Sequence, residues 1–493
     1  MKQANFCLLL CLFLYASCTD SPTPDISDPA QPPNILFILI DDIGIISTPP
    51  YTGPTDDGTA WSLQPDSLID PSSAVPYNMP NLMSFASGAK QMNYMYATPS
   101  CAPSRAQLLT GRYPFSNGIV FPAFPSDSAA SSQYPGSGYL ADSILTYANY
   151  LQDLGYYTGF GGKYNLRYGI ADIQAQSQGE DAYNDMVQQQ MLHLNQHGFD
   201  TTFGPAHFQT VSQGDSIYKG GLALIGNTVD YHPAFADSMF FPYLLQDWAL
   251  QFIETQQETE KPYYLHYCFG LIHDSDPEAF AGMTDSEEFA AKIELADSII
   301  GTLLSMVEND SNTVVIIAGD NGTETFTSNF GPGYATVHQG DTIPGGKLTY
   351  QSRGSRVPFL IRWPGQLDNQ PYNELVDFAD VFGTIYEIAG GSGSLPPLDG
   401  QSFLHAISDG KLGTPQPVRQ AVYSQMQREG FVADKKYLYL VEDVYNDTTG
   451  SWYDIQSSPQ VDVPISASDV PVDEQQKLEA FFEALGTRGM AEN

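Results

Sequence analysis

Four oxygen-bearing side chains follow two apolar stretches of this 493-residue chain and form its first candidate for chemistry. Asp41 and Asp42 come directly after the apolar run 34–40, and Asp320 and Asn321 follow the β-branched run 313–318 after one glycine. Such short apolar runs are typical of buried parallel strands, and ligands of open α/β sheets bind at the carboxyl ends of those strands. Four oxygen donors without a neighbouring Cys or His cluster favour a hard cation, either Ca²⁺ or Mg²⁺. One acidic strand end is ordinarily a solvated turn, so it is the pair of ends that indicates a metal site.

A second candidate is Cys101, which opens the segment Cys-Ala-Pro-Ser-Arg-Ala-Gln-Leu-Leu-Thr-Gly-Arg over residues 101–112. In purely structural terms, Cys101 would be a small buried hydrophobe ahead of a helix capped by Ser104. The length of the segment points elsewhere, because Cys-x-Pro-Ser-Arg followed by Leu-Thr-Gly-Arg resembles the signature of the formylglycine-dependent sulfatases of the alkaline phosphatase superfamily. The resemblance implies an enzyme, a sulfuric ester hydrolase.

The resemblance also implies a modified residue and a metal. In that family a formylglycine-generating or sulfatase-maturing enzyme oxidises the cysteine to an aldehyde, and the hydrated aldehyde is the nucleophile. Cys101 is thus the expected precursor of formylglycine, and the maturation enzyme is an expected partner. One Ca²⁺ (Mg²⁺ is the less expected ion) would lie beside the aldehyde hydrate, held by Asp41, Asp42, Asp320, Asn321 and the modified Cys101.

Cations are needed as well, because a sulfate monoester surrounds a weakly electrophilic sulfur with negative oxygen. Lys163 lies in Gly-Gly-Lys-Tyr-Asn-Leu, which resembles the family segment Gly-Lys-Trp-His-Leu. Lys347 lies in Gly-Gly-Lys-Leu-Thr, and His273 follows an apolar run where the family has a Pro-His pair. By this resemblance these three surround the sulfate and the leaving oxygen, and Arg105 of the Cys101 segment joins the catalytic set. Without that context the lysines would be solvated charges and the histidine a structural residue.

Asn165 departs from the family, which has a histidine at this position. That histidine is taken to remove the proton from the remaining hydroxyl, which expels sulfate and restores the aldehyde. A carboxamide cannot accept this proton, although it can hold the hydroxyl by a hydrogen bond. We therefore expect slow release of sulfate unless a metal-bound Asp, a water or His338 serves as the base. The alternative is a loop shift that turns Asn165 away from Cys101.

The order of the predicted elements favours an α/β fold. A large lobe would hold a mostly parallel (mixed) central sheet between helix layers. A small C-terminal lobe would hold an antiparallel sheet and one helix. The predicted strands of the large lobe are 34–40, 156–161, 263–272, 313–318 and 357–362, and its helices are 80–87, 104–110, 143–154, 241–257, 289–308 and 377–389. The small lobe has predicted strands at 421–425, 437–441 and 452–455 and a helix at 473–485. We place the catalytic domain at 34–405 and the C-terminal subdomain at 406–493.

The N-terminal residues predict export. Residues 1–17 read as a signal peptide, because the apolar run 6–14 is too short to span a bilayer and small residues follow it. Cys18 resembles the lipidated first residue of a bacterial lipoprotein, although Tyr15 stands where leucine is usual. We expect an outer-membrane or periplasmic lipoprotein, with plain secretion as the alternative. Residues 18–33, rich in Pro, Asp and Ser, read as a solvated tether.

Cysteine use agrees with this assignment. Of the five cysteines, Cys7 and Cys11 would leave with the signal peptide, Cys18 would be lipidated and Cys101 oxidised. Only Cys268 remains, so we expect no disulfide framework despite export.

The charge of the chain excludes some partners. A formal net charge of -37 repels nucleic acid and anionic lipid, so we expect no nucleic acid and contact with a membrane only through a lipid anchor. Several of the 20 basic residues nevertheless gather in the motifs above, which fits a pocket for an anion. They are Arg105, Arg112, Lys163, Arg167, Lys347, Arg353 and Arg356.

Three functions remain open from the sequence. The first is a working sulfatase, whose substrate would be a sulfated carbohydrate if the enzyme is anchored at the cell surface. The second, motivated by Asn165, is a catalytically weakened homologue that binds sulfated glycans. The third is a phosphodiester or phosphonate hydrolase of the same superfamily. Turnover of sulfate and phosphonate esters separates them.

Overall fold

The structure is a computed structural model that describes residues 31–49, 51, 61–65, 75–121, 139–167, 180–204, 211–213, 216–218, 222–225, 228–231, 241–273, 280–324, 334–338, 341–446, 449–456 and 462–485. The predicted signal peptide, Cys18 and most of the predicted tether lie outside these residues. Within them, no helix combines the length and the apolar character needed to cross a bilayer.

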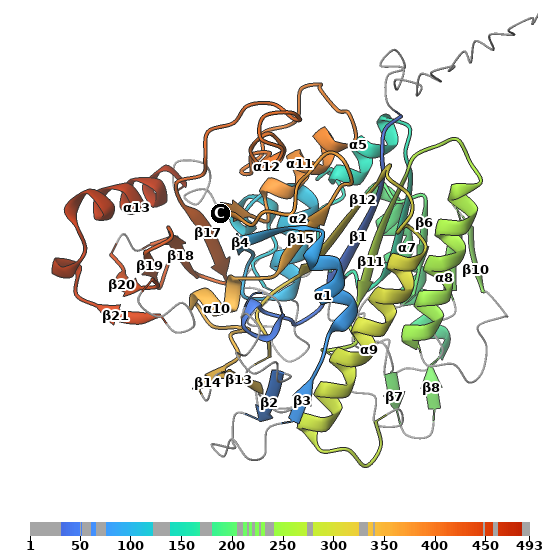
Figure 1. Cartoon of the computed structure of the whole chain (residues 1–493), viewed down its shortest axis with the longest axis horizontal. Helices are drawn as coiled ribbons and strands as arrows, with labels where there is room; N and C mark the ends of the chain where they lie inside the picture. Colours follow the sequence, from blue (N-terminus) through green and yellow to red (C-terminus); the bar gives the residue numbers. More distant parts are fainter. Residues whose placement is uncertain are drawn as a thin grey trace, which may run out of the picture. The chain divides into compact units, whose positions relative to one another are not determined.

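A ten-stranded sheet forms the centre of the large lobe, in the order β10-β9-β6-β5-β11-β1-β12-β15-β4-β16 (Figure 1). The neighbouring strands β6, β5, β11, β1 and β12 are parallel, and β15 is antiparallel to both β12 and β4. The predicted mostly parallel, mixed sheet is therefore confirmed. The strands are β1 (Asn34–Ile40), β4 (Lys90–Tyr96), β5 (Tyr157–Gly162), β6 (Thr201–Phe203), β9 (Leu222–Ile225), β10 (Thr228–Tyr231), β11 (Tyr263–Phe269), β12 (Thr313–Gly319), β15 (Phe359–Arg362) and β16 (Tyr372–Asp377).

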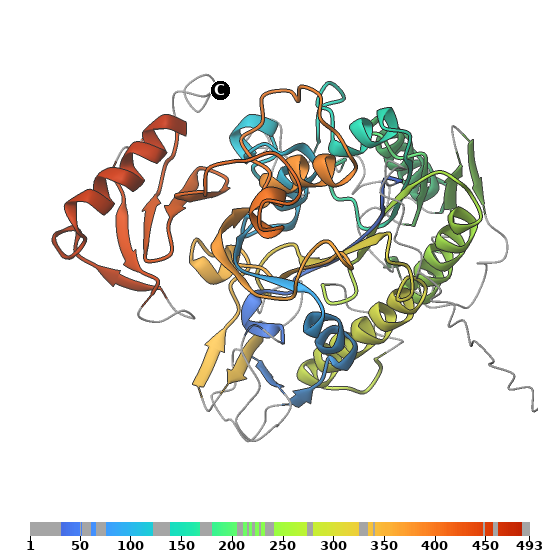
Figure 2. The same cartoon turned by 45° about the horizontal axis from the view of Figure 1, so that its top comes forward.

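Both faces of the sheet are buried, which explains why β1 is apolar throughout. Successive side chains of a strand point to opposite faces. Leu36, Ile38 and Ile40 pack into one core with helices α1 (Pro80–Ser87), α8 (Phe241–Gln257) and α9 (Asp285–Ser305). Ile35, Phe37 and Leu39 pack into a second core with α2 (Cys101–Thr110), α5 (Tyr147–Asp153) and α11 (Asp380–Ile388). Figure 2 shows these two helix layers on opposite sides of the sheet.

Several predicted boundaries were wrong, each for a local reason. The helix predicted at 143–154 begins at Tyr147, because Thr146 accepts a hydrogen bond from the Ala148 amide and caps it. The helix predicted at 377–389 is α11, and Asp377 instead ends the unpredicted strand β16. The strand predicted at 357–362 starts after Pro358, which has no N–H to donate. The strand predicted at 263–272 ends at Phe269 and turns back before His273.

The C-terminal lobe has the predicted antiparallel sheet and single long helix. Five strands pair in sequence order, and α13 (Val472–Leu485) packs on them through Leu478 and Phe482. The strands are β17 (Val422–Met426), β18 (Glu429–Ala433), β19 (Tyr437–Val441), β20 (Ser451–Asp454) and β21 (Val463–Ile465). A four-stranded sheet in the order β14-β13-β2-β3 lies in the large lobe. Its strands are β2 (Trp61–Pro65), β3 (Val75–Tyr77), β13 (Tyr334–His338) and β14 (Asp341–Pro344).

Candidate active site

The strand register brings the predicted site residues to one edge of the large sheet. Ile40 pairs with Phe269 and with Gly319, and Gly162 pairs with Cys268, so four parallel strands end level. Strand β4 runs in the same direction as β12 because the antiparallel β15 lies between them, so the chain after Tyr96 reaches the same edge. The residues that follow these strand ends are Asp41, Asp42, Lys163, Asn165, His273, Asp320, Asn321 and, at the start of α2, Cys101.

Three non-glycine residues with a strained backbone lie at this edge of the sheet. Asp42, Asn165 and Leu348 have φ values of 56°, 60° and 59°, in the left-handed region that non-glycine residues seldom adopt. Each such residue costs on the order of 1–3 kcal/mol, and they collect where a site needs a fixed geometry. Here they belong to the turns that carry Asp41, Lys163 and Lys347.

The three carboxylates are fully buried and are paired with cations from separate elements. Arg105 donates from Nη2 to Asp41 Oδ1 (3.0 Å) and from Nε to Asp320 Oδ2 (2.9 Å). Lys163 Nζ pairs with the other oxygen of Asp41. Charges can be buried in this way only where they are paired and hydrogen-bonded. The Asp41 side of the site is therefore held by two cations, one from α2 and one following β5.

Asp42 has its own pair of basic partners. Lys347 Nζ donates to Asp42 Oδ2 at 2.6 Å, and His273 Nδ1 lies 3.1 Å from the same oxygen. Asn321 Nδ2 donates to Asp42 Oδ1 at 2.8 Å. Lys347 also pairs with Glu324 at 3.0 Å. All the predicted basic residues of the catalytic set thus contact the carboxylate cluster.

The protonation of the cluster follows from this pairing. Burial opposes ionisation of Asp41, yet the charges of Lys163 and Arg105 outweigh it and hold the pKa of Asp41 well below its usual value. The pKa of Asp42 is likewise lowered, because Lys347 and His273 outweigh burial. Burial, followed by the charge of Asp41, raises the pKa of Asp320 to about 8. Asp320 shares its cation Arg105 with Asp41.

The residues at this edge fit a hard cation. Among the described residues, Asn321 Oδ1 is buried without a hydrogen-bond partner, while its Nδ2 is used twice. An amide oxygen beside carboxylates is a ligand that Ca²⁺ accepts. Asp41, Asp42 and His273 also offer ligand atoms that all lie within 4.8 Å of one another. The donor chemistry agrees with the predicted oxygen site.

Cys101 is the first residue of α2 and is only 5% exposed. Ser100, not Ser104, precedes the helix, and the Ser104 hydroxyl donates to the Asp320 carbonyl at 2.5 Å. The structural alternative in which Ser104 caps the helix was therefore wrong. Burial raises the pKa of the Cys101 thiol, although the charges of Lys163 and Lys347 oppose the shift. The encoded thiol is thus poorly suited to act as a thiolate.

Asn165 points at Cys101. Its Nδ2 donates to Cys101 Sγ at 3.0 Å, and its side chain is buried. The alternative of a loop shift that turns Asn165 away is therefore wrong. His338, the other candidate base, has a side chain outside the described residues.

Sequence reasoning missed two residues of the site. Glu324 balances the charge of Lys347, and Ser104 ties α2 to the end of β12. Glu324 stands four residues after Asp320, and that short spacing was the available signal. Ser104 was read only as a cap.

The carboxylate cluster at the carboxyl edge of the sheet and the buried Cys101 at the start of α2 form the arrangement that the resemblance of the Cys101 segment predicted. The chain belongs to the sulfatase family: the family model described as Sulfatase matches residues 33–391. It is a sulfuric ester hydrolase by this membership.

The curated relatives of this chain are sulfatases, and the solved structures that match it share its fold. N-acetylgalactosamine-6-sulfatase of Canis lupus familiaris is 25% identical over 408 residues, covering 79% of this chain and 68% of the relative. Human arylsulfatase A is 26% identical over 410 residues, covering 80% of this chain and 70% of the relative. The fold is similar to the crystal structure of PsFucS1 sulfatase from Pseudoalteromonas sp., with a TM-score of 0.66, 18% identity and coverage of 94% and 92% of the two chains. It is also similar to Ps i-CgsB in complex with k-i-k-neocarrahexaose, with a TM-score of 0.64, 17% identity and coverage of 93% and 94%.

Proposed function

We propose that this chain hydrolyses sulfate esters of a sulfated carbohydrate, with a formylglycine formed from Cys101 and a bound Ca²⁺. The observation that carries the proposal is the gathering of charged groups around one buried cysteine. Arg105 of the same helix pairs with Asp41 and Asp320, Lys163 pairs with Asp41, and Asn165 donates a hydrogen bond to Cys101 Sγ at 3.0 Å.

The two absent groups would fill chemical gaps in this site. Asp41, Asp42, Asp320 and Asn321 would hold Ca²⁺, which when bound supplies positive charge beside the developing oxyanion. Oxidation of Cys101 would supply an oxygen nucleophile, which the encoded side chain lacks.

Lys163 and Lys347 act as fixed cations in this proposal. Burial lowers the tendency of each amine to carry a proton, but the carboxylates of Asp41 and Asp42 outweigh it and raise the pKa of both lysines. Both therefore stay charged at neutral pH and are suited to bind sulfate oxygens. Neither is suited to exchange a proton with the substrate.

His273 is the best candidate to donate a proton to the leaving oxygen. Its side chain is 13% exposed, whereas its partner Asp42 is fully buried. An imidazole held by a carboxylate at the surface of the site can deliver a proton to an incoming alcohol oxygen. His273→Gln should therefore slow substrates with poor leaving groups much more than activated aryl sulfates.

Asn165 should affect the two halves of the catalytic reaction unequally. Its amide donates a hydrogen bond at position 101, so it can orient a hydroxyl there. It cannot accept the proton whose removal releases sulfate. We infer that the second half of the reaction limits turnover, and the contact with Cys101 is the observation that favours this slower variant of the function.

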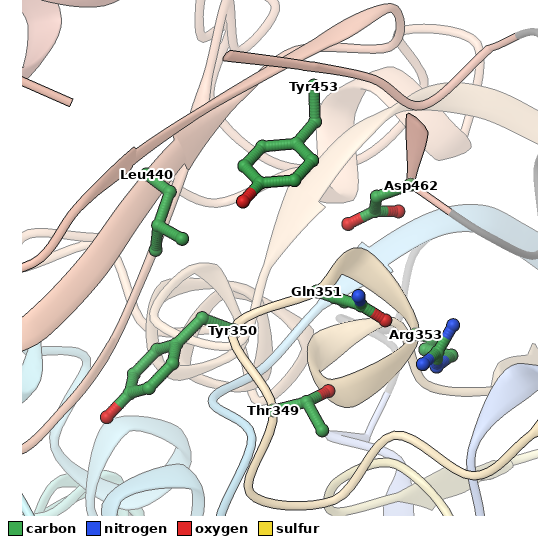
Figure 3. A pocket seen from close by; sticks show the side chains of 7 residues that line it. All are labelled: Thr349, Tyr350, Gln351, Arg353, Leu440, Tyr453 and Asp462. Carbon is green, nitrogen blue, oxygen red and sulfur yellow. The ribbon is translucent and has the colours of Figure 1, made fainter. Parts of the chain in front are cut away.

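A pocket between the catalytic lobe and the C-terminal lobe supports a carbohydrate substrate (Figure 3). The pocket has a volume of about 290 Å³, and one of its lining residues, Thr349, is two residues after Lys347 in the chain. Tyr350 and Tyr453 offer aromatic surface, and Arg353 offers a cation for a second sulfate or a carboxylate. The structurally similar Ps i-CgsB was solved in complex with k-i-k-neocarrahexaose, which agrees with a carbohydrate substrate. The lining residues are Thr349, Tyr350, Gln351, Arg353, Leu440, Tyr453 and Asp462.

The decisive experiment combines maturation with turnover. The chain is produced in a host with an active sulfatase-maturing enzyme, and the peptide that contains Cys101 is analysed by mass spectrometry. We expect formylglycine at position 101 and hydrolysis of sulfate esters, with no activity in Cys101→Ala. Unmodified cysteine in active protein would contradict the mechanism, and faster turnover of a matched phosphonate ester would reassign the function.

We further propose export as a lipoprotein attached through Cys18. The support is the short apolar run 6–14 followed by small residues ahead of that cysteine. Metabolic labelling with a fatty acid should mark the parent chain and leave Cys18→Ala unlabelled. Equal labelling of both would contradict the anchor.

A further inference from the structure

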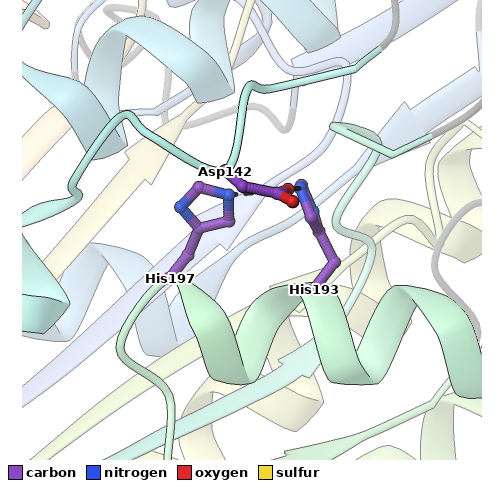
Figure 4. A group of neighbouring side chains, drawn as sticks. All are labelled: Asp142, His193 and His197. Atoms are coloured by element: carbon purple, nitrogen blue, oxygen red, sulfur yellow. Dashed lines mark hydrogen bonds and ion pairs between the residues drawn. The ribbon is translucent and has the colours of Figure 1, made fainter.

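A second polar cluster lies outside the active site, on the core side that contains α5. Asp142 from the turn before α5 meets His193 and His197, which stand four residues apart at the end of α7 (Glu180–Gln196). Figure 4 shows the side chain of Asp142 beside the two rings, with its carboxylate next to His193. Both histidines are buried, whereas the side chain of Asp142 is 58% exposed. The proposed reaction assigns this cluster no chemical step.

The distances within the cluster match the edges of a small tetrahedron. His193 Nε2 lies 3.2 Å from His197 Nε2 and 3.3 Å from Asp142 Oδ1. Zinc binds nitrogen and carboxylate oxygen at about 2.0–2.2 Å, so two ligand atoms at a tetrahedral angle are about 3.3–3.5 Å apart. Two of the three distances between ligand atoms are therefore close to those that a bound Zn²⁺ requires, and all three ligand atoms lie within 4.8 Å of one another.

The two ring nitrogens of the cluster face each other. His193 Nε2 lies 3.2 Å from His197 Nε2, 3.3 Å from Asp142 Oδ1 and 2.9 Å from the carbonyl oxygen of Leu140. Asp142 Oδ1 also accepts a hydrogen bond from the Tyr139 hydroxyl at 2.9 Å. Only one proton fits between two ring nitrogens 3.2 Å apart, and a cation at the centre would take the place of that proton.

A second contact orients the ring of His193. The other nitrogen of His193 is held by Tyr164, whose hydroxyl lies 3.0 Å from Nδ1. Such an outer contact commonly orients a metal-bound histidine.

We propose that Asp142, His193 and His197 bind one Zn²⁺ ion, separate from the Ca²⁺ of the proposed active site. Two imidazoles and one carboxylate are a donor set that suits zinc better than a hard cation. The exposed Asp142 gives the ion an entry path, and the fourth position would be filled by water or by the Leu140 carbonyl.

The proposed ion would also position the catalytic segment. Tyr164 stands between Lys163 and Asn165, so the contact of its hydroxyl with His193 joins the cluster to the active site. The Leu140 amide binds the carbonyl of Leu166 in the same segment (2.8 Å). These residues act by positioning, and this part of the inference rests on the proposed function, whereas zinc binding itself does not.

Zinc binding is tested on the full folded chain by titration with ZnCl₂ in the presence of excess Ca²⁺, which occupies the hard site. We expect one equivalent of bound zinc by elemental analysis. Asp142→Asn, an exposed change that spares the core, should weaken zinc at least about tenfold, and Tyr164→Phe should weaken it about 10–100-fold. The matched control Asp153→Asn removes a nearby exposed carboxylate of α5 and should bind zinc like the parent.

Two further measurements keep the test decisive. Cobalt bound in place of zinc should give the strong visible absorption of a tetrahedral site in the parent and in Asp153→Asn, but not in His193→Gln. Zinc should raise the Tm of the parent by a few degrees and leave Asp142→Asn unchanged. Equal zinc affinity and equal cobalt spectra in the parent, Asp142→Asn and His193→Gln would overturn the proposal and leave adventitious binding as the explanation.

The positioning role is tested separately from the site. Removing zinc with a zinc-selective chelator should lower kcat on an aryl sulfate while KM changes little, and Asp142→Asn should show the lowered kcat without chelator. Zinc binding with an unchanged kcat would retain the site and overturn its positioning role. Loss of all sulfatase activity at full zinc content would instead contradict the proposed function.

Discussion

Two buried carboxylate clusters of this enzyme differ in what satisfies their oxygens. At the junction of the lobes, Asp377 accepts hydrogen bonds from the amides of Ala379 (3.0 Å) and Tyr423 (3.3 Å). Its neighbour Asp380 accepts from the amides of Asp377 and Gln401, both at 2.8 Å. Arg419 is the cation that pairs with Asp380. Backbone amides cannot move away from these carboxylates without a local change of the chain, so the cluster has a fixed geometry.

At the active edge the donors are mostly side chains. Asp41 and Asp42 are held by Lys163, Lys347 and Arg105, and the amide of Asp42 donates to Asp320 at 3.1 Å. Side-chain cations can turn toward a sulfate or make room for a metal ion, whereas backbone amides cannot. The comparison teaches that burial and charge alone do not separate the two clusters, whereas the share of side-chain and backbone donors does.

The largest expected effect is the loss of catalysis when the active-edge cluster of Asp41, Asp42 and Asp320 is changed. Asp320→Asn keeps the shape of the side chain but removes a proposed metal ligand, so kcat/KM should fall about 10³-fold, or about 4 kcal/mol. Calcium content measured by elemental analysis should fall with it. Asp377→Asn, the matched change at the fixed cluster, should keep calcium and retain activity within a few-fold. Full calcium in Asp320→Asn would show that the ligand set is wrong.

The cluster of Asp377 and Asp380 should make the stability of the fold depend on pH. Burial, with the charge of Asp380 adding to it, raises the pKa of Asp377 to about 7, against about 3.9 in an unfolded chain. The folded state therefore keeps a proton that the unfolded state has already lost, so stability falls as pH rises toward 7. Asp377→Asn lacks this titration and should gain on the parent by about 3 kcal/mol between pH 5 and pH 8.

Urea unfolding of parent and variant at several pH values measures this gap. Asp153→Asn, with its exposed carboxylate, should follow the parent across the whole range. A gap between Asp377→Asn and the parent that stays constant with pH would mean that Asp377 is ionised in the folded state throughout.

A smaller gain is expected from restoring a base at the active edge. Asn165→His should raise steady-state turnover by up to about 10²-fold, because a general base contributes about 10²–10⁴-fold where it is well placed. The parent should show a burst of alcohol product in stopped-flow assays, and the variant should lose it. No burst in the parent together with no gain in the variant would mean that another residue already acts as the base.

The smallest effect concerns the pocket between the lobes. Arg353→Gln should raise KM for a multiply sulfated oligosaccharide about tenfold, since a partly exposed charge-assisted contact contributes about 1–2 kcal/mol. Hydrolysis of a small aryl sulfate should be unchanged, and Lys411→Gln, an exposed charge elsewhere, should change neither. An equal rise of KM for both substrates would place Arg353 in the support of the active site.

The sequence predicted the parts of the site that depend on strand ends. Asp41 and Asp320 could be assigned because each follows an apolar run, and parallel strands bring their carboxyl ends together. Lys163 was assigned only because its segment resembles one of the sulfatase family. The direction of Asn165 could not be predicted, because it depends on a left-handed φ of 60° in a turn. His193 and His197 were not singled out, because their partner Asp142 is 51 residues or more away in sequence and no local pattern joins them.

The fold was predicted in outline for the same reason. Strands β1 and β12 are uniformly apolar, so both were found at nearly their full length. Strands β4 and β16 were missed because they mix polar with apolar residues, and their pairing spans nearly 280 residues of sequence. Non-local pairing of polar strands leaves no short-range signal.

The burial of α2 limits how long Cys101 is accessible while the chain is being synthesised. All ten residues of this helix are buried, and Ser104 is sealed by a hydrogen bond to Asp320, which is made 216 residues later. At about 5–20 residues per second, that interval lasts roughly 10–40 s. Under the proposed maturation, a modifying enzyme would reach Cys101 only while the chain around it is still open. The order of the strands along the chain therefore decides how long the cysteine stays available, and slower synthesis should raise the fraction of matured protein.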